Sequence, residues 1–419
     1  LEICFFDFSA DCYRKVQLAE KEREMKLTEE TPFFFIYSVW TKNGEYREQV
    51  KRLVTDYDNY ISLKLAGDDA YLSEKMVGYP AELDEVYAES FEEQKKEWFS
   101  CVGDGIQECR NTWEHKKWNI TDFPEFELAI TIDRPELYYD FLQKDWTRFC
   151  HDYWKNNFLE HHTLSQKRVT RIYIGNQFCH NLFPKKKLLF QVLEKALENN
   201  LAVTLAFSYI RNHLLEEIDE LLQELEVWCQ SREKEAGKDQ EEIIVNDWAM
   251  PILLQGKPHL KPVLGVLLNK RRKDVRLPYK HGIGNHVDSL AENNLNCGFY
   301  QDYLKNTFDI QRFEFESCGY KVTIPDGHHS LHLPFFQTNT SQYCTLYAVC
   351  RYGDRKKQKL PENCPKYCEQ KVFLYPKHLK MVGRYNSLFG YDEKILWDEK
   401  QLQDYLEQGI DRIVVNVSL

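Results

Sequence analysis

The chain has 419 residues, of which 43% are hydrophobic, and no apolar run reaches the roughly 18 residues that a membrane-spanning helix needs. Its formal net charge is −11, and the acidic excess lies in residues 1–165, whereas the remainder is close to neutral. This balance argues against general nucleic-acid binding, which needs a basic surface, and the asymmetry indicates two domains with different partners.

The first part of the chain predicts an α+β domain that ends near residue 165. Strands are expected at 33–40 and 128–133, with helices at 45–65 and 82–98 between them and a long aromatic helix over 135–161. The domain is acidic and rich in aromatic residues, which are typical either of a packed core or of a groove that binds a peptide or partner protein.

Strands and helices then alternate through residues 166–419. Strands are expected at 169–174, 201–206, 242–246, 262–268, 310–315 and 410–417, and helices at 187–199, 212–235, 249–254, 299–307 and 402–408. Such alternation predicts parallel strands with helical crossovers. We therefore expect an α/β, TIM-barrel-like C-terminal domain, complete or partial, with an inserted cysteine-rich loop at 344–368 and a strand pair within 373–391.

The thirteen cysteines are odd in number and are not spaced as a disulfide framework, which favours a reducing, cytoplasmic protein. Cys350, Cys364 and Cys368 lie within nineteen residues, and thiolates from one irregular loop can surround a single metal centre. Cys179 follows a predicted strand and is the best candidate for a fourth ligand, while Cys344 is an alternative to Cys350. An iron–sulfur cluster is preferred over zinc, because structural zinc sites usually use paired Cys-x2-Cys motifs.

Polar side chains near the predicted strand ends form a candidate substrate pocket. They are Asn246, Asp247, Asn269, Arg271, Arg272 and Glu314. Barrel enzymes gather functional groups where strands end, although the same residue types also cap strands and form turns. His328, His329 and His332 alternate with apolar residues, which favours a strand with one polar face over a metal site.

Several segments resemble peptidase family U32, especially its small iron–sulfur members in oxygen-independent ubiquinone hydroxylation. The similar segments are 171–179, which ends in a cysteine, 242–247, 262–269, 310–316, Leu333-Pro334, and the spacing of Cys350, Cys364 and Cys368. The resemblance implies a barrel-like fold, a [4Fe–4S] cluster and hydroxylation of an RNA, a quinone precursor or a peptide, with prephenate as an oxygen source. It implies a second U32-like subunit as a partner.

Two functions stay open at this point. The chain is expected to be an oxygen-independent hydroxylase or its subunit, or else a binding component of a maturation complex that grips a peptide or partner enzyme through residues 1–165. Protease activity is not expected, because the sequence has neither a G-x-S-x-G elbow nor an H-E-x-x-H motif.

Overall fold

The computed structural model describes residues 2–7, 12–17, 23–30, 35–41, 44 and 48, and residues 123–417 except 237–240, 272, 274, 276–290, 355–356, 362 and 375–379. Apart from residue 48, the helices predicted at 45–65 and 82–98 therefore lie outside the described residues. No helix in the described part of the chain is long and apolar enough to cross a membrane.

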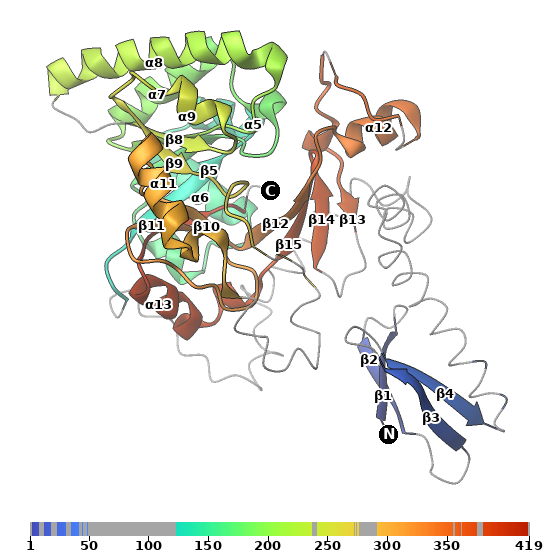
Figure 1. The fold of residues 1–419 in the computed structure, drawn as a ribbon. Helices are drawn as coiled ribbons and strands as arrows, with labels where there is room; N and C mark the ends of the chain where they lie inside the picture. Colours follow the sequence, from blue (N-terminus) through green and yellow to red (C-terminus); the bar gives the residue numbers. More distant parts are fainter. Residues whose placement is uncertain are drawn as a thin grey trace. The chain divides into compact units, whose positions relative to one another are not determined.

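The chain divides into two compact units, residues 1–85 with 375–379, and residues 86–374 with 380–419. The first contains two antiparallel hairpins (Figure 1), formed by β1 (Glu2–Asp7) with β2 (Cys12–Gln17) and by β3 (Arg23–Glu30) with β4 (Phe35–Thr41). Strand β4 confirms the strand predicted at 33–40.

The second unit is built on an eight-stranded parallel sheet that is almost a closed barrel. In spatial order the strands are β10 (Glu314–Glu316), β11 (His329–Leu333), β16 (Ile410–Val415), β5 (Glu127–Ile132), β6 (Arg171–Gly175), β7 (Ala202–Ala206), β8 (Glu241–Val245) and β9 (Leu260–Leu264). The two edges meet at a parallel bridge between Leu264 and Phe313, where the Leu264 N–H donates to the Arg312 carbonyl at 3.0 Å. The predicted TIM-barrel-like fold is confirmed.

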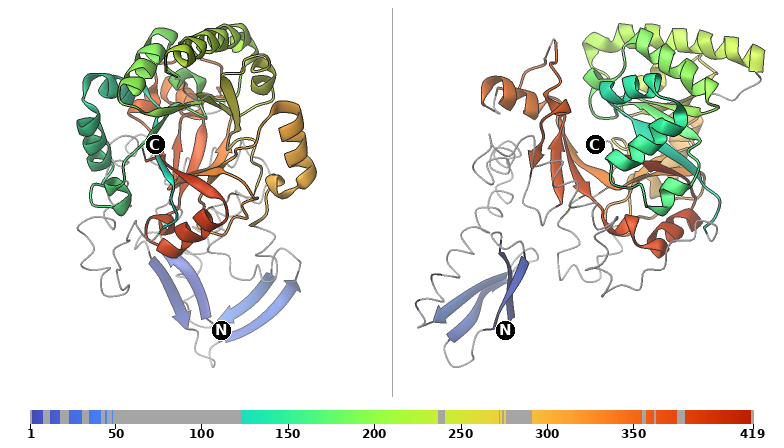
Figure 2. Two further views of the ribbon diagram at one scale, coloured as in Figure 1. Left: turned by 90° about the vertical axis from the view of Figure 1, so that its left-hand side faces the viewer. Right: turned by 180° about the vertical axis from the view of Figure 1, so that it is seen from behind.

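Helices follow most strands and surround the sheet (Figure 2). They are α5 (Pro135–Gln143), α6 (Trp146–Asn156), α7 (Lys186–Glu198), α8 (Leu215–Ala236), α9 (Ala249–Leu253), α11 (Gly298–Phe308) and α13 (Glu399–Glu407). Because these crossovers cover the outside of the sheet, its strands are buried on both faces.

An antiparallel sheet interrupts the barrel between β11 and β16. Its strands run in the order β12 (Phe335–Thr340), β15 (Ser387–Tyr391), β14 (Met381–Arg384) and β13 (Phe373–Leu374), and helix α12 (Thr345–Tyr352) follows β12. The Asn416 amide donates to the Phe335 carbonyl at 2.8 Å and accepts from the Phe335 N–H at 3.1 Å. This pair of bonds ties the start of the inserted sheet to the C-terminal end of β16.

Three predictions about this unit were wrong in detail. The domain boundary after residue 165 fails because β5 pairs with β6 and β16, so residues 127–165 belong to the barrel rather than to a separate N-terminal domain. The helix predicted at 135–161 is two helices, because Asp145 caps α6 by accepting the Arg148 N–H at 2.9 Å. The inserted loop is partly regular, since Cys350 lies on α12.

Candidate functional site

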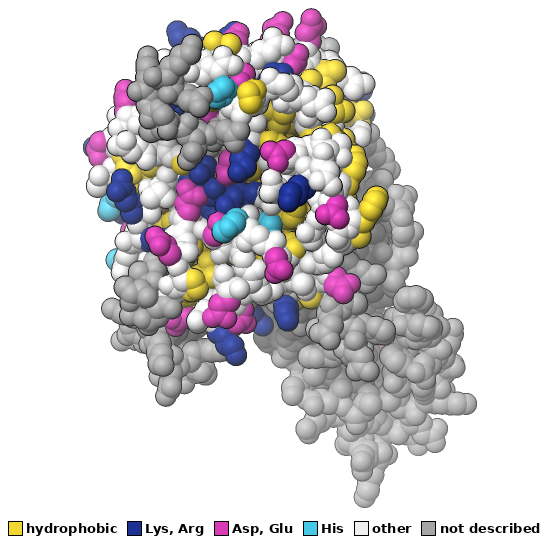
Figure 3. Space-filling view, turned by 60° about the vertical axis from the view of Figure 1, so that its left-hand side comes forward, with side chains coloured by type: hydrophobic (Ala, Val, Ile, Leu, Met, Phe, Trp, Pro, Cys, Tyr) yellow, Lys and Arg dark blue, Asp and Glu magenta, His cyan; other side chains and the backbone are white. Residues whose placement is uncertain are grey.

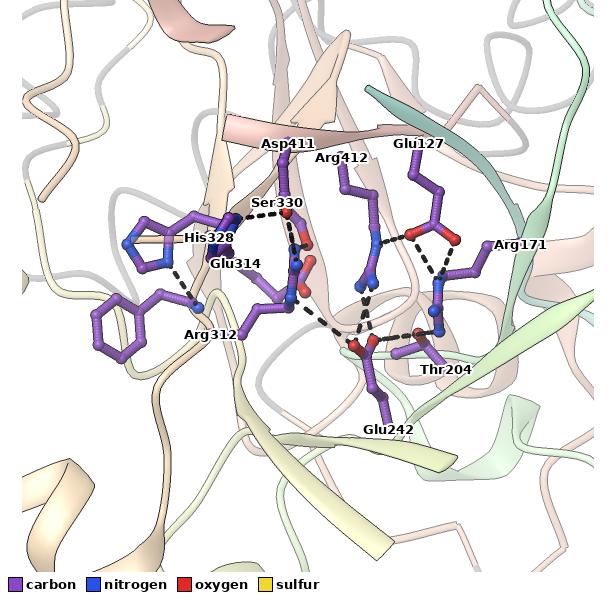
Figure 4. A network of polar contacts seen from close by, with 12 residues as sticks. Glu127, Arg171, Thr204, Glu242, Arg312, Glu314, His328, Ser330, Asp411 and Arg412 are labelled. Carbon is purple, nitrogen blue, oxygen red and sulfur yellow. Dashed lines mark hydrogen bonds and ion pairs between the residues drawn. The ribbon is translucent and has the colours of Figure 1, made fainter. Parts of the chain in front are cut away.

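The interior of the barrel is unusually polar at its N-terminal end. Figure 3 shows Lys and Arg side chains gathered on one face, with Asp, Glu and His beside them. Strands β5, β6, β8 and β16 contribute Glu127, Arg171, Glu242 and Arg412, which form the network in Figure 4. Barrel interiors are usually filled by branched apolar side chains, whereas this end holds a layer of ion pairs. We call these four residues the ionic floor of the barrel.

Arg412 is the centre of this floor. Its side chain is 3% exposed, and its guanidinium donates to both carboxylate oxygens of Glu242, at 2.6 and 3.1 Å, and to Glu127 at 2.6 Å. Burial works to raise the pKa of Glu242, but Arg412 and Arg171 outweigh it and lower that pKa to about 2. Glu242 is therefore ionised at neutral pH and balances the charge of Arg412.

A second polar layer lies above the floor, around Glu314. The Glu314 carboxylate is fully buried, accepts the Tyr173 hydroxyl at 3.1 Å, and contacts Nε2 of His332 at 2.5 Å. The Tyr173 hydroxyl in turn accepts from Arg412 at 3.1 Å. Burial raises the pKa of Tyr173 well above its ordinary value, so its hydroxyl keeps its proton. Apolar residues fill the space between these groups: Ala129, Ala206, Ile244, Val263 and Val414.

A small cavity of about 40 Å³ opens at the C-terminal end of the barrel, above this second layer. Its polar lining includes Asp133, Asn176, Glu316, His332 and Asn416. Its position agrees with the location of active sites in barrel enzymes. Sequence reasoning missed Asp133, Tyr173 and His332 as site residues.

Most of the residues predicted to line the barrel mouth form hydrogen bonds to neighbouring backbone groups. The Asn246 amide donates to the Phe207 carbonyl at 2.8 Å and accepts the Leu267 N–H at 3.1 Å. Asp247 caps α9, accepting from Ala249 and Met250. The capping interpretation therefore describes both residues in this structure.

The remaining predicted pocket residues lie at different depths. Asn269 donates to the Glu314 carbonyl at 3.1 Å, and the Glu314 side chain points into the barrel rather than at its rim. Arg271 donates to the Cys318 sulfur at 3.0 Å and to the Glu316 carbonyl. The Arg271 guanidinium thus connects protein groups at the barrel mouth and does not face a ligand. Arg272 lies outside the described residues.

Lys273 is a further buried cation at the mouth. Its ammonium group pairs with the Glu316 carboxylate and donates to Gln337 at 3.0 Å. Burial lowers the pKa of Lys273, although Glu316 opposes that shift. The pair links the loop after β9 to β10 and β12.

Gly265, directly after β9, offers a test of how tightly the mouth is packed. A Cβ at this position would lie 2.1 Å from Oδ1 of Asn246 and 2.7 Å from Ile244. Gly265→Ala should displace the Asn246 amide and lower the free energy of unfolding by about 1–3 kcal/mol, measured by urea denaturation. Gly256→Ala is unsuitable as a control because φ is +80° there, whereas Gly298→Ala meets nothing within 4 Å and should cost much less.

Four of the described cysteines belong to three separate segments of the barrel unit. Cys179 follows β6, Cys344 is the N-cap of α12, and Cys364 and Cys368 lie in the segment after α12. Burial raises the pKa of Cys179 to about 11, with Cys364 contributing, and that of Cys368 to about 12, with Cys179 and Cys364 contributing. The pKa of Cys344 is raised by burial first and then by Cys179, Cys368 and Cys364. Cys364 is therefore one of the causes that raise the pKa of each of the other three thiols.

Two sets of hydrogen bonds position Cys179 and Cys344. The Asn176 side-chain oxygen accepts the N–H groups of Phe178 and Cys179, each at 2.9 Å, which fixes the turn after β6. The Cys344 sulfur accepts the Tyr347 N–H at 3.3 Å and donates to the Tyr385 carbonyl at 3.0 Å. A sulfur at a helix N-terminus is in a favourable place for negative charge.

Cys350 is six residues from Cys344 on the same helical element, which corresponds to about 9 Å along the axis and about two thirds of a turn around it. The two sulfurs therefore face different directions. In the described part of the chain, no three Cys, His, Asp or Glu side chains are arranged to hold a metal ion as they stand. The metal assignment made from the sequence stays a prediction.

The histidines considered as ligands serve three separate contacts. His328 is exposed and pairs with Asp411 at 2.9 Å, His329 stacks on Phe313 with ring centroids 4.7 Å apart, and His332 contacts Glu314. They do not converge on a common point. Only His332 lines the cavity.

Comparison with known proteins adds no identification: no family model, no curated protein and no solved structure matches this chain.

Proposed function

We propose that the barrel unit is an iron–sulfur enzyme, or a subunit of one, that carries out oxygen-independent hydroxylation. Cys179, Cys344, Cys364 and Cys368 are the proposed ligands of a [4Fe–4S] cluster beside the barrel mouth. The proposal is supported by hydrogen bonds that connect the segments of Cys179, Cys344 and Cys368. Arg384 and the adjacent Tyr385 hold the Cys368 carbonyl and the Cys344 sulfur, and Asp133 accepts from Tyr385 and from Asn176, whose side chain holds the Cys179 turn.

The donor set fits such a group in chemical type. Four cysteines are the usual ligands of a [4Fe–4S] cluster, and their burial favours neutral thiols until a metal replaces the protons. The Cys344 sulfur accepts a helix N-terminal N–H, a contact that a metal-bound thiolate could keep. This location is the reason for preferring Cys344 over Cys350, which the spacing alone placed first.

When bound, the cluster would supply one-electron chemistry. The chain itself orients the ligands and shapes the site. Asn176 holds the turn that carries Cys179, and Arg384 donates to the Cys368 carbonyl at 2.8 Å, which fixes the turn that carries the last ligand. The cavity lies beside the Cys179 turn, because Asn176, Gln177 and Phe178 line it.

The test is anaerobic purification followed by iron and sulfide analysis and electron paramagnetic resonance. We expect about four iron and four sulfide per chain, with both lost in Cys179→Ala, Cys344→Ala and Cys364→Ala. Cys350→Ala should keep its iron, and so should Cys229→Ala, which removes a buried thiol on α8.

Stoichiometric zinc, or no metal in the wild-type protein, would contradict the proposal. Iron lost in Cys350→Ala but kept in Cys344→Ala would restore the assignment that the spacing alone suggested. A protein with its full iron content then permits an activity test, in which prephenate-dependent hydroxylation of RNA or quinone precursors is measured without oxygen.

A further inference from the structure

A polar centre inside the barrel is separate from the four thiols. Glu314 and His332 are 0% and 2% exposed, and they lie on neighbouring strands β10 and β11. Burying a carboxylate and an imidazole in a barrel costs free energy that a well-packed apolar pair would not cost. Such a buried acid–base pair next to a cavity is a candidate functional site.

The hydrogen bond to Glu314 determines which ring nitrogen of His332 carries the proton and which one is left as an acceptor. Its Nε2 contacts the Glu314 carboxylate, which can only accept, so Nε2 carries the proton. The other oxygen of that carboxylate accepts the Tyr173 hydroxyl. Nδ1 of His332 has no hydrogen-bond partner in the described part of the chain, and the ring lines the cavity. A neutral imidazole in this tautomer offers Nδ1 as an acceptor.

A second acceptor lines the same cavity. Oδ1 of Asp133 is buried and has no hydrogen-bond partner among the described residues, while Oδ2 accepts the Tyr385 hydroxyl at 3.4 Å. The Glu316 carboxylate, also in the lining, is already paired with Lys273. A ligand that carries hydrogen-bond donors would satisfy Asp133 and His332, whereas an anion would be repelled by Asp133.

The cavity lining also has an apolar part. Phe178, Ala206, Val266 and Phe389 form it, and the rings of Phe178 and Phe389 meet edge to face with centroids 4.8 Å apart. A space of 40 Å³ holds about three waters. It is the size of a short hydroxylated carbon fragment and not of a whole cofactor, so it suits one end of a larger molecule.

From these contacts we infer that the cavity binds a hydroxylated end group, such as a vicinal diol, with His332 as general base. One hydroxyl donates to Asp133 and another to Nδ1 of His332. In the reaction the O–H bond breaks, its electron pair stays on oxygen, and the proton forms an N–H bond at Nδ1. The imidazolium charge is then balanced by Glu314, which acts as a positioning residue.

The inference uses none of the four thiols, so its test is independent of the iron analysis. The probe is ethylene glycol, titrated into full-length protein with ¹⁵N-labelled histidine and followed by nuclear magnetic resonance. We expect a saturable shift of the His332 ring signals and none at His329, which lies on the same strand but stacks on Phe313 outside the cavity. Ethanol, with one hydroxyl, should bind more weakly.

Two variants sharpen the test. Asp133→Asn removes the charged acceptor and should weaken ethylene glycol binding about tenfold. Glu314→Gln can donate as well as accept, so the single Nε2–H tautomer of His332 should give way to a mixture in the ¹⁵N spectrum, which a purely structural role would not cause. A shift that stays linear in ethylene glycol indicates binding at high concentration only. A linear response would overturn the inference. Equal shifts at His329 and His332, or protons on both His332 nitrogens at neutral pH, would overturn it as well.

Discussion

Arg412→Met should lower the free energy of unfolding of the barrel unit by about 3–5 kcal/mol, the range observed when one partner of a buried ion pair is removed. The substitution keeps an unbranched side chain of similar length but removes the charge from the centre of the floor. Glu242 would retain Arg171 but lose its two shortest ionic contacts, and Glu127 would lose one of its two arginines. Urea denaturation followed by circular dichroism measures the change.

Arg148→Met is the matched control, because Arg148 is exposed on α6, and it should change the free energy of unfolding by less than about 0.5 kcal/mol. The double variant Arg412→Met with Glu242→Met removes both charges and should recover much of the loss. If Arg412→Met is as stable as the wild type, or the double variant is less stable than the single one, the pair of Arg412 and Glu242 does not determine the stability of the barrel unit.

The order of strands and helices in the barrel could be predicted from the sequence because each crossover unit shows its own periodicity. Lys186–Glu198 and Ala202–Ala206 lie within a residue of their predicted bounds. The unit at β5 was misassigned because the charge asymmetry along the chain placed the domain boundary after it. Surface composition reports on solvent and partners, whereas membership of a sheet is decided by strand pairing that only tertiary structure reveals.

The polar barrel interior leaves a signal in the sequence. Arg171 and Tyr173 on β6, and Glu314 and Glu316 on β10, occupy alternate positions, so in each pair both side chains point to the same face of the sheet. In a strand covered by helices on the outside, a repeated polar alternate position indicates an inward-facing polar layer. What could not be predicted is which of these groups meet across the barrel, because those contacts join residues as far apart as Tyr173 and His332.

In the cysteine-rich segment, too, spacing along the sequence did not reveal the local structure. Spacing singled out Cys350 as a ligand on the assumption of an irregular loop, but residues Thr345–Tyr352 form a helix that ends at Gly353, whose φ of +63° suits glycine. A cysteine that precedes this helix and a glycine that ends it are both features of the sequence. A helix between them places Cys344 at the N-cap, where a sulfur ligand is favoured, and Cys350 on the body of the helix.

Acidification should destabilise the barrel unit before its carboxylates titrate, because buried histidines are held neutral. His162 accepts the Leu164 N–H at Nδ1 and donates from Nε2 to the Leu396 carbonyl at 2.9 Å, which fixes the neutral tautomer. Burial lowers its pKa to about 4, and burial likewise lowers the pKa of His329 to about 4. The unfolded chain binds these protons near pH 6.5.

The resulting stability is complete above pH 6.5 and is lost as the pH falls from 6.5 to 4, since the unfolded state binds more protons in that window. Each histidine should contribute about 3 kcal/mol over the window. The low pKa of Glu242 acts in a second window, from its ordinary value of 4.5 down to about 2, where its protonation removes the stabilisation from Arg412 and Arg171.

Urea denaturation at several pH values between 7.5 and 4 measures the slope of the unfolding free energy. In His162→Gln the slope should fall by up to about 1.4 kcal/mol per pH unit, the contribution of one proton. His151→Gln, which removes an exposed histidine on α6, is the control and should keep the wild-type slope. An unchanged slope in His162→Gln would mean that His162 is already protonated in the folded protein, in conflict with its two hydrogen bonds.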